Sequence, residues 1–518
     1  MTTRNLLNCF SILTLAFFAA NTKAEESLPN VIVILADDMG LDSVARFNSK
    51  LNLKTPAIDR LAADGMSFQD AHSTSAVCSP TRYSVLTGRY NWRSRLKKGI
   101  VGKWERPLFE DQRVTIAEMF QSKDYQTACI GKWHLGWNWP KEGGGFTTKS
   151  NEIDFTKPIK GGPNDHGFEY YFGDDVPNWP PFAWRENDRI LGNITTTMKA
   201  GAMVGVSAGP AVEDWDFRAV LSEYSKRWHR YIVEQADESK PFFLYASMPS
   251  PHTPIAPHQD FQGRSGISEY ADFLIQTDAA VSRILDALEQ TNQAKDTLIF
   301  FTCDNGTSPK ANFEQLKENG VHLNENWRGW KADAYEGGHR VPFVVRWPGQ
   351  IKAGSVSNET ITLTDIMATC ADVLDYPLPS TCAEDSVSLW PTLQGKAVEK
   401  PLHEVVVHQS GLGYFAVRKG PWKLLLCHGS GGWSDPREPA AIKRNLPPVQ
   451  LFHMTDDSKE ANNLHAQHPE IVRELTADLK SLVEAGRSTV GDIQPNHDHQ
   501  TWWPGLPWPR STSKAPVE

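Results

Sequence analysis

The chain of 518 residues is too long for one compact core, so we expect two domains. Its 40% hydrophobic and 22% charged residues are typical of an ordinary globular protein. The net charge of −9 excludes a general attraction to nucleic acid or to an anionic membrane, and an anionic substrate would need a locally basic pocket.

Residues 1–24 have the features of a signal peptide. Arg4 supplies a positive charge, residues 13–20 form an apolar run, and Thr22-Lys23-Ala24 offers a small-residue cleavage site. The apolar run is short for a membrane span, and we find no later transmembrane candidate. We therefore expect secretion or periplasmic export, without stable insertion into a membrane.

Export would place the cysteines of the mature chain in an oxidising compartment. Cys370 and Cys382 are close enough in sequence to close a small loop, so a disulfide between them is a plausible hypothesis. The cysteines do not form a CxxC pair or a His-Cys cluster of the kind that predicts a zinc site.

Residues 25–400 alternate between expected strands and helices. Apolar runs predict buried strands over 31–36, 242–246, 298–302 and 343–346, and helix candidates cover 55–64, 115–122 and 270–289. This alternation predicts an α/β fold in which helices cover both faces of a mostly parallel sheet. The loops are rich in proline and glycine, notably over 143–180.

Residues 401–518 have a different texture and predict a smaller α+β domain. Short strands are expected over 405–408, 415–418 and 422–426, followed by a helix near 470–485. The tail from Trp502 to Arg510 is too rich in proline for regular structure, and it either wraps over the body or hangs free.

The 18 tryptophans are many for this length. Core packing is the default interpretation, but flat platforms for sugar rings are the alternative. The platform interpretation gains weight in the proline-rich stretches around Trp137 and Trp139 and around Trp179 and Trp184.

Oxygen-bearing side chains end two of the expected buried strands. Asp37 and Asp38 follow the first, and Asp304 and Asn305 follow another. Strand ends are where α/β sheets place their sites, and two adjacent buried carboxylates need a cation. Asp and Asn oxygens suit calcium or magnesium better than zinc, although each motif alone is often only a turn.

Cys78 begins the segment Cys-Ser-Pro-Thr-Arg82, near the start of an expected helix. A thiol beside an arginine at such a place would have a lowered pKa and could act as a nucleophile. From the cysteine alone, a buried structural thiol is the more ordinary interpretation.

The motif Cys-x-Pro-x-Arg, followed by Leu86-Thr-Gly-Arg89, resembles the signature of formylglycine-dependent sulfatases. The segments Gly131-Lys-Trp-His-Leu-Gly136, Ser250-Pro-His-Thr-Pro254 and 331–342 are similar to further motifs of that family, in the same order. The resemblance extends from Asn30 to Leu464. It implies an alkaline-phosphatase-like catalytic domain over 25–400 that hydrolyses a sulfate monoester.

The resemblance also implies roles for individual residues. Cys78 would be oxidised to formylglycine by a formylglycine-generating or sulfatase-maturing enzyme, and its hydrate would form a covalent sulfo-enzyme. Arg82 would stabilise the ionised hydroxyl, and Lys132 and Lys331 would neutralise the sulfuryl oxygens. His134 would deprotonate the second hydroxyl, and His252 would protonate the leaving alcohol. One calcium ion would be held by Asp37, Asp38, Asp304, Asn305 and the modified Cys78.

The substrate is less clearly indicated. The loop over 167–188 mixes carboxylates, amides and aromatic rings, and it looks similar to loops of bacterial sulfatases that act on sulfated galactose-type sugars. We expect a sulfated carbohydrate, with a 6-O-sulfate on a galacto-configured sugar as the specific hypothesis. His166, Asp175 and Asn178 are candidate sugar contacts.

Two alternatives remain open at this point. A phosphonate or phosphodiester hydrolase would share the superfamily fold and sometimes the modified cysteine. A non-catalytic carbohydrate-binding relative would keep its cysteine unmodified, although every expected catalytic position is filled here.

Overall fold

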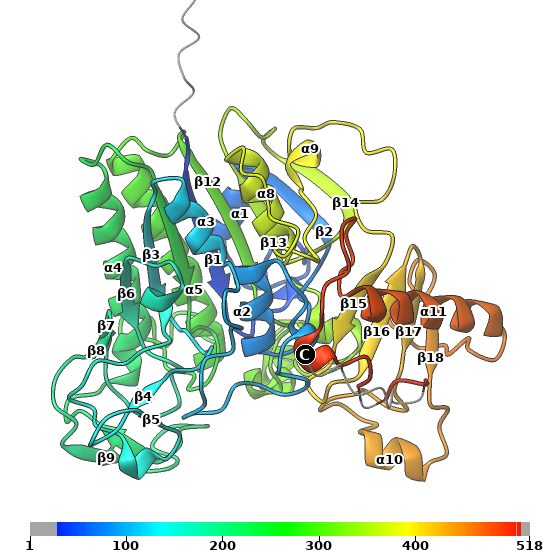
Figure 1. Ribbon diagram of the computed structural model, residues 1–518, viewed down its shortest axis with the longest axis horizontal. Helices are drawn as coiled ribbons and strands as arrows, with labels where there is room; N and C mark the ends of the chain where they lie inside the picture. Colours follow the sequence, from blue (N-terminus) through cyan, green and yellow to red (C-terminus); the bar gives the residue numbers. More distant parts are fainter. Residues whose placement is uncertain (1–27, 504, 509–518) are drawn as a thin grey trace, which may run out of the picture.

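A ten-stranded sheet forms the centre of the computed structural model, which describes residues 28–503 and 505–508 (Figure 1). In spatial order its strands are β14 (Ser355–Thr362), β2 (Met66–His72), β13 (Phe343–Arg346), β12 (Thr297–Cys303), β1 (Asn30–Ala36), β11 (Phe242–Ser247), β3 (Gln126–Gly131), β6 (Tyr170–Gly173), β7 (Arg185–Glu186) and β8 (Arg189–Ile190). The strands from β12 to β6 run parallel, as does the pair β14 and β2. The expected mostly parallel sheet is therefore confirmed, but β13 runs antiparallel to both of its neighbours.

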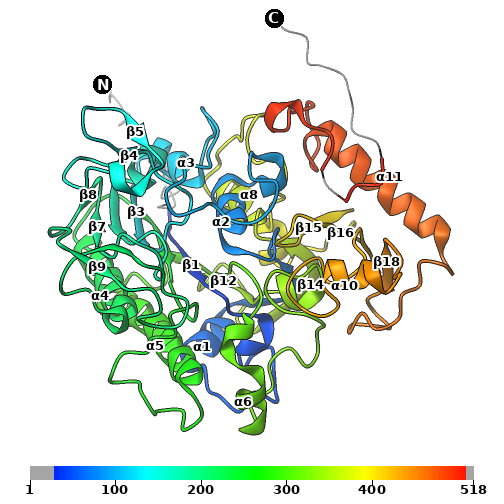
Figure 2. The ribbon, with the colours of Figure 1, turned by 90° about the horizontal axis from the view of Figure 1, so that it is seen from below.

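Helices cover both faces of this sheet (Figures 1 and 2). One face carries α1 (Pro56–Asp64), α4 (Val220–Gln235) and α5 (Glu269–Gln290), and the other carries α2 (Cys78–Thr87), α3 (Ile116–Ser122) and α8 (Asp365–Val373). Strands β1, β11 and β12 are buried along their whole length because they lie between these layers. The remaining short elements are α6 (Phe313–Glu318), α7 (Glu336–His339), α9 (Trp390–Leu393), β4 (Trp139–Pro140), β5 (Phe146–Thr147), β9 (Thr196–Met198) and β10 (Gly209–Ala211).

A second, four-stranded antiparallel sheet follows in the C-terminal part. It consists of β15 (Val406–Gln409), β16 (Phe415–Lys419), β17 (Trp422–Leu425) and β18 (Gln450–His453), with α10 (Glu438–Lys443) beside it and α11 (Pro469–Ala485) packed on it. Trp503 is buried in the core of this part, and its indole N–H donates to the Trp92 carbonyl at 3.1 Å. The described part of the tail therefore packs over the body.

Some of the predictions made from the sequence differ from the structure, and one lies outside the residues it describes. Cys370 and Cys382 are buried free thiols rather than a disulfide. Trp137 and Trp139 are core residues that lie under the Arg185 guanidinium, so the platform interpretation is wrong for them. The expected signal peptide lies outside the described residues. Within those residues, we find no helix with the length and apolar character needed to cross a membrane.

Candidate active site

The oxygen-bearing residues of two strand ends meet at one edge of the sheet. Strands β1 and β12 are parallel neighbours in which Ala36 lies opposite Cys303, so the residues that follow them come together. The Asp38 amide donates to Asp304 Oδ1 at 3.2 Å, and the Asn305 amide group donates to Asp38 Oδ1 at 2.8 Å. Asp37 and these three residues are almost completely buried.

This group fits a hard divalent cation. Its donors are carboxylate and amide oxygens, which are the ligands that calcium and magnesium prefer. Asn305 Oδ1 is buried and has no hydrogen-bond partner, as expected of an oxygen whose natural partner is an ion. Atoms of Asp37, Asp38, Cys78 and His252 also lie within 4.8 Å of one another.

Three buried cations face the carboxylates. Lys132 Nζ lies 2.5 Å from Asp37 Oδ2, and the Lys331 ammonium pairs with Asp38. Arg82 donates to Asp304 Oδ2 from Nε at 3.1 Å and from Nη2 at 2.8 Å. Removing one partner of such a buried pair costs about 3–5 kcal/mol, so these cations are integral to the site.

The charges of the lysines are set by these partners. Burial alone would lower the pKa of Lys331, but Asp38 and the other carboxylates outweigh it and raise the pKa. The pKa of Lys132 is raised in the same way, chiefly by Asp37. Both side chains therefore carry the positive charge that an anion would meet.

Cys78 is the first residue of α2 and lies between the charged groups. Its Sγ is 3.4 Å from Lys331 Nζ and 3.6 Å from Asp37 Oδ1. The expectation of a lowered pKa is wrong: burial raises the pKa of this thiol to about 12, despite the two lysines. An unmodified thiol would stay protonated here and would be a weak nucleophile.

Two histidines line the cavity above Cys78, which has a volume of about 420 Å³. Burial, followed by Lys132 and Arg82, lowers the pKa of His134 well below its usual value. Its Nε2–H faces the Val101 carbonyl at 3.3 Å, which leaves the buried Nδ1 as a free lone pair. A neutral ring with a free lone pair can accept a proton.

His252 follows β11 and has the opposite tautomer. Its Nδ1–H donates to the Thr253 carbonyl at 2.6 Å, so Nε2 faces the site, 3.9 Å from Asp38 Oδ2. Burial lowers the pKa of His252 to about 4. The ring therefore rests neutral, and an acid role requires it to take up a proton when an anionic substrate is present.

The three candidate sugar contacts do not all reach the cavity. Asn178 lines it: the Asn178 Nδ2 group donates to the Gly205 carbonyl at 3.0 Å, while Oδ1 is buried without a partner. Asp175 lies behind His134 and accepts a hydrogen bond from its backbone N–H at 3.1 Å. His166 is half-buried against Phe109, with ring centroids 4.3 Å apart, and it does not belong to the cavity lining.

Sequence reasoning missed part of the cavity wall. Trp179, which it did single out, lines the cavity, but Trp433 comes from the C-terminal part and lines it as well. Trp433 is 41% exposed. It sits in a Gly- and Ser-rich turn whose sequence carries no signal of a binding role.

Comparison with known proteins identifies the class to which this fold and this site belong. Residues 29–376 match the Sulfatase family model, so the chain belongs to the sulfatase family and is a sulfuric ester hydrolase with an alkaline-phosphatase-like fold. It is similar to an N-acetylgalactosamine-6-O-sulfatase of Bacteroides thetaiotaomicron, with 32% identity over 88% of this chain and 93% of the relative.

Two further comparisons agree. Human steryl-sulfatase is 29% identical over 93% of this chain and 92% of its own length. A Bacteroides thetaiotaomicron protein, solved in work on the metabolism of multiple glycosaminoglycans, superimposes with a TM-score of 0.76 and 30% identity. The superposition covers 88% of this chain and 99% of that one.

Proposed function

We propose that the protein removes a sulfate group from a sulfated carbohydrate, and specifically a 6-O-sulfate from a galacto-configured sugar. The observation that carries this proposal is the cavity above Cys78. Its lining includes Asp38, Cys78 and Lys331 of the charged centre. It also offers the unpartnered Asn178 oxygen and the indoles of Trp179 and Trp433. Hydroxyl donors and apolar ring faces of a sugar match such walls. The N-acetylgalactosamine-6-O-sulfatase relative supports the choice of sugar.

We propose that Cys78 works after conversion to formylglycine by a maturing enzyme. The hydrated aldehyde supplies a hydroxyl nucleophile, which the protonated thiol does not. Lys132 and Lys331 hold the sulfuryl oxygens as negative charge develops. The free Nδ1 of His134 accepts a proton from the hydrate at position 78. His252 takes up a proton from solvent on Nε2 and passes it to the leaving oxygen.

We propose calcium as the metal. Asp37, Asp38, Asp304 and Asn305 would hold it, together with the modified residue at position 78. When bound, the ion supplies Lewis-acid polarisation of a sulfate oxygen. Arg82 contributes by holding Asp304 in place through two hydrogen bonds, and it lies 3.6 Å from Asp37.

The proposed substrate fits an exported enzyme. The N-terminal segment carries the signal-peptide features described above, and a polysaccharide outside the cytoplasm is accessible only to a secreted or periplasmic protein. Mass spectrometry of the mature chain from its native host tests both points, through its first residue and through formylglycine at position 78.

Sulfate release from a panel of sugars with single sulfates at defined positions tests the function, with a Cys78→Ala variant beside the wild type. Release from one galacto-configured 6-sulfate, absent in the variant, is the expected result. Release from another regioisomer would contradict the substrate. A preference for phosphonate or phosphate diesters would favour the alternative hydrolase, and exclusively unmodified Cys78 would favour the non-catalytic binder.

A further inference from the structure

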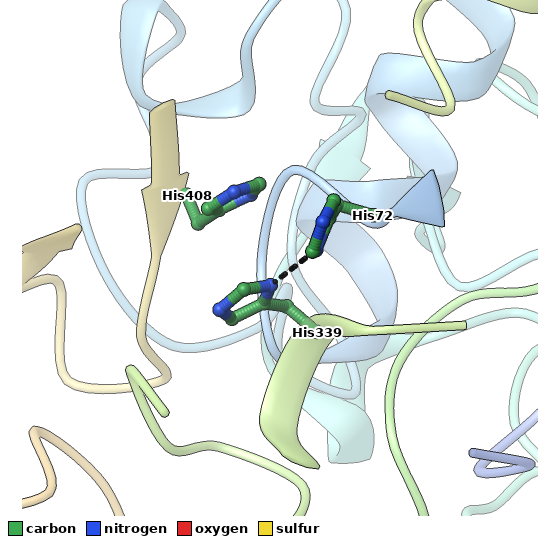
Figure 3. A group of neighbouring side chains, drawn as sticks. All are labelled: His72, His339 and His408. Atoms are coloured by element: carbon green, nitrogen blue, oxygen red, sulfur yellow. Dashed lines mark hydrogen bonds between the residues drawn. The ribbon is translucent and has the colours of Figure 1, made fainter. Parts of the chain in front are cut away.

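Three histidines that the mechanism does not use form a buried cluster (Figure 3). His72 ends β2, His339 ends α7, and His408 belongs to β15 of the second sheet. All three are at most 1% exposed. The cluster therefore joins the central sheet, the segment that follows Lys331 and the C-terminal sheet.

The ring geometry does not suit a shared metal ion, although nitrogen atoms of the three rings lie within 4.8 Å of one another. His339 and His408 are stacked, with centroids 4.0 Å apart and planes inclined by 13°. An imidazole binds a metal along a lone pair that lies in its ring plane, and two rings stacked in this way cannot both direct such a lone pair at one ion at bonding distance. The cluster needs another explanation.

The hydrogen bonds of the cluster are consistent with one arrangement of protons. Asp70 accepts from Arg340 at 2.7 Å, so it is an ionised acceptor, and His72 Nε2, at 2.9 Å, carries a proton toward it. His72 Nδ1 then accepts from His339 Nδ1–H at 3.0 Å. His339 Nε2 faces both the Lys423 ammonium at 3.0 Å and the Ala334 carbonyl at 3.3 Å. Because an ammonium can only donate and is the nearer group, Nε2 accepts from Lys423.

This arrangement requires His339 to be neutral. Burial lowers the pKa of His339 well below its usual value, and His408 and Lys423 lower it further. The His408 Nδ1–H donates to the Ser73 carbonyl at 3.2 Å, and burial likewise lowers the pKa of that ring. Two neutral rings can stack without electrostatic repulsion.

Lys423 anchors the other end of the chain of hydrogen bonds. It extends from β17 and is fully buried. Besides His339, its ammonium donates to Glu336 at 2.9 Å and to Glu460 at 2.8 Å, which accounts for all three of its protons. Glu460 also accepts from the backbone N–H of Glu336 at 2.7 Å. The C-terminal part therefore holds both ends of α7.

Helix α7 in turn contacts two loops of the active site. The Gly306 N–H, next to Asn305, donates to the Gly338 carbonyl at 2.9 Å. A side chain at position 306 would lie 1.8 Å from the Gly337 carbonyl oxygen, so only glycine permits this approach. The Ser73 N–H, in the segment that leads to Cys78, donates to the His339 carbonyl at 2.8 Å.

We propose that the chain Asp70–His72–His339–Lys423 is a positioning device for the active site, in which the C-terminal sheet sets α7 and, through it, the loops carrying Asn305, Lys331 and Cys78. The inference rests on the proposed function, because it takes those loops as the metal-binding and sulfate-binding elements. His72, His339 and Lys423 are positioning residues, since none of them lines the cavity.

The test breaks the chain at its centre with His339→Leu, which keeps the volume but removes both nitrogens. Lys423 keeps two carboxylate partners in this variant, so we expect it to fold. His339→Gln can restore a donor and an acceptor. Lys419→Met is the control, because Lys419 of β16 pairs with Glu474 and Asp478 of α11 rather than with the cluster. Each variant is assayed for kcat, KM, calcium affinity by calorimetry and fold by circular dichroism.

We expect His339→Leu to lower kcat by about 10- to 100-fold, as displaced catalytic groups do, with a smaller change in KM. Calcium affinity should fall at least about tenfold, as when groups that orient metal ligands are removed. His339→Gln should recover part of both, and Lys419→Met should match the wild type. Wild-type kcat and calcium affinity in a folded His339→Leu variant would overturn the proposal.

Two results separate this proposal from the proposed function. An inactive wild type would contradict the proposed function. The calcium affinity of the variants would still decide whether the chain of hydrogen bonds positions the loop that carries Asn305. Nitrogen-15 shifts of labelled histidine rings give a second activity-independent readout. They should show His339 protonated at Nδ1 and bare at Nε2, and the reverse tautomer would overturn the chain of hydrogen bonds.

Discussion

Lys331 offers the sharpest test of the proposed chemistry. Its ammonium pairs with Asp38 and lies 3.4 Å from Cys78 Sγ, and the residue is 5% exposed. Little water therefore reaches this position, so solvent cannot easily substitute for the lost charge in a Lys331→Ala variant. Loss of one preorganised donor to a developing oxyanion lowers the rate by about 10²–10³-fold, which corresponds to about 2.7–4 kcal/mol. We expect kcat/KM to fall by about 10²–10³-fold in this variant.

The assay is sulfate release at saturating calcium from the best sugar sulfate of the panel. Lys331→Arg should retain part of the activity, because it keeps the charge but not the compact shape of the ammonium. Lys317→Ala is the control: Lys317 lies on the surface 4.0 Å from Glu325, and such pairs contribute little. Circular dichroism checks that each variant is folded. A loss below about tenfold in Lys331→Ala would refute the assignment of Lys331 to the sulfuryl oxygens.

The remaining predictions concern the metal, the tail and pH. Removing calcium with EGTA should abolish sulfate release and lower the melting temperature, and added calcium should restore both; full activity in EGTA would contradict the metal assignment. Trp503→Ala should lower the free energy of unfolding in urea by about 3–5 kcal/mol, because a fully buried indole is lost; an unchanged midpoint would show that the tail contributes nothing. Asp365 raises the pKa of His403 above 6.5 although burial opposes it. The pair therefore stabilises the fold fully below pH 6.5, and this stabilisation is lost as pH rises through the folded-state pKa of His403. We expect the melting temperature to fall over that pH range, and to fall less in a His403→Gln variant.

The sequence was sufficient for the parts of the site that depend on local order along the chain. An apolar run followed by Asp37 and Asp38 predicts a strand end, and a second run before Asp304 predicts another. Parallel strands then bring such ends to one edge, and the register of Ala36 opposite Cys303 shows that this is how the carboxylates meet.

Properties that depend on packing were beyond the sequence. The position of Cys78 at a helix start suggested a lowered pKa, but complete burial raises it instead, and burial is a property of the folded core. His166 precedes β6, whereas Asp175 and Asn178 follow it, and only Asn178 reaches the cavity. Trp433, from a turn of the C-terminal part, lines the cavity, and Lys423 of β17 contacts His339, although the sequence suggested that part only as a separate domain.

The charges of the site explain how a protein of net charge −9 can bind an anion. The centre balances three buried carboxylates against three buried cations, namely Asp37, Asp38 and Asp304 against Arg82, Lys132 and Lys331. Without a metal the centre is formally neutral, so it has no excess charge to attract a sulfate ester. The proposed calcium ion would make it positive by two, within a cavity where salt screens charges weakly. If the proposal is correct, the metal would create the locally basic pocket that the composition demands, and the two lysines would direct that charge at the sulfuryl oxygens.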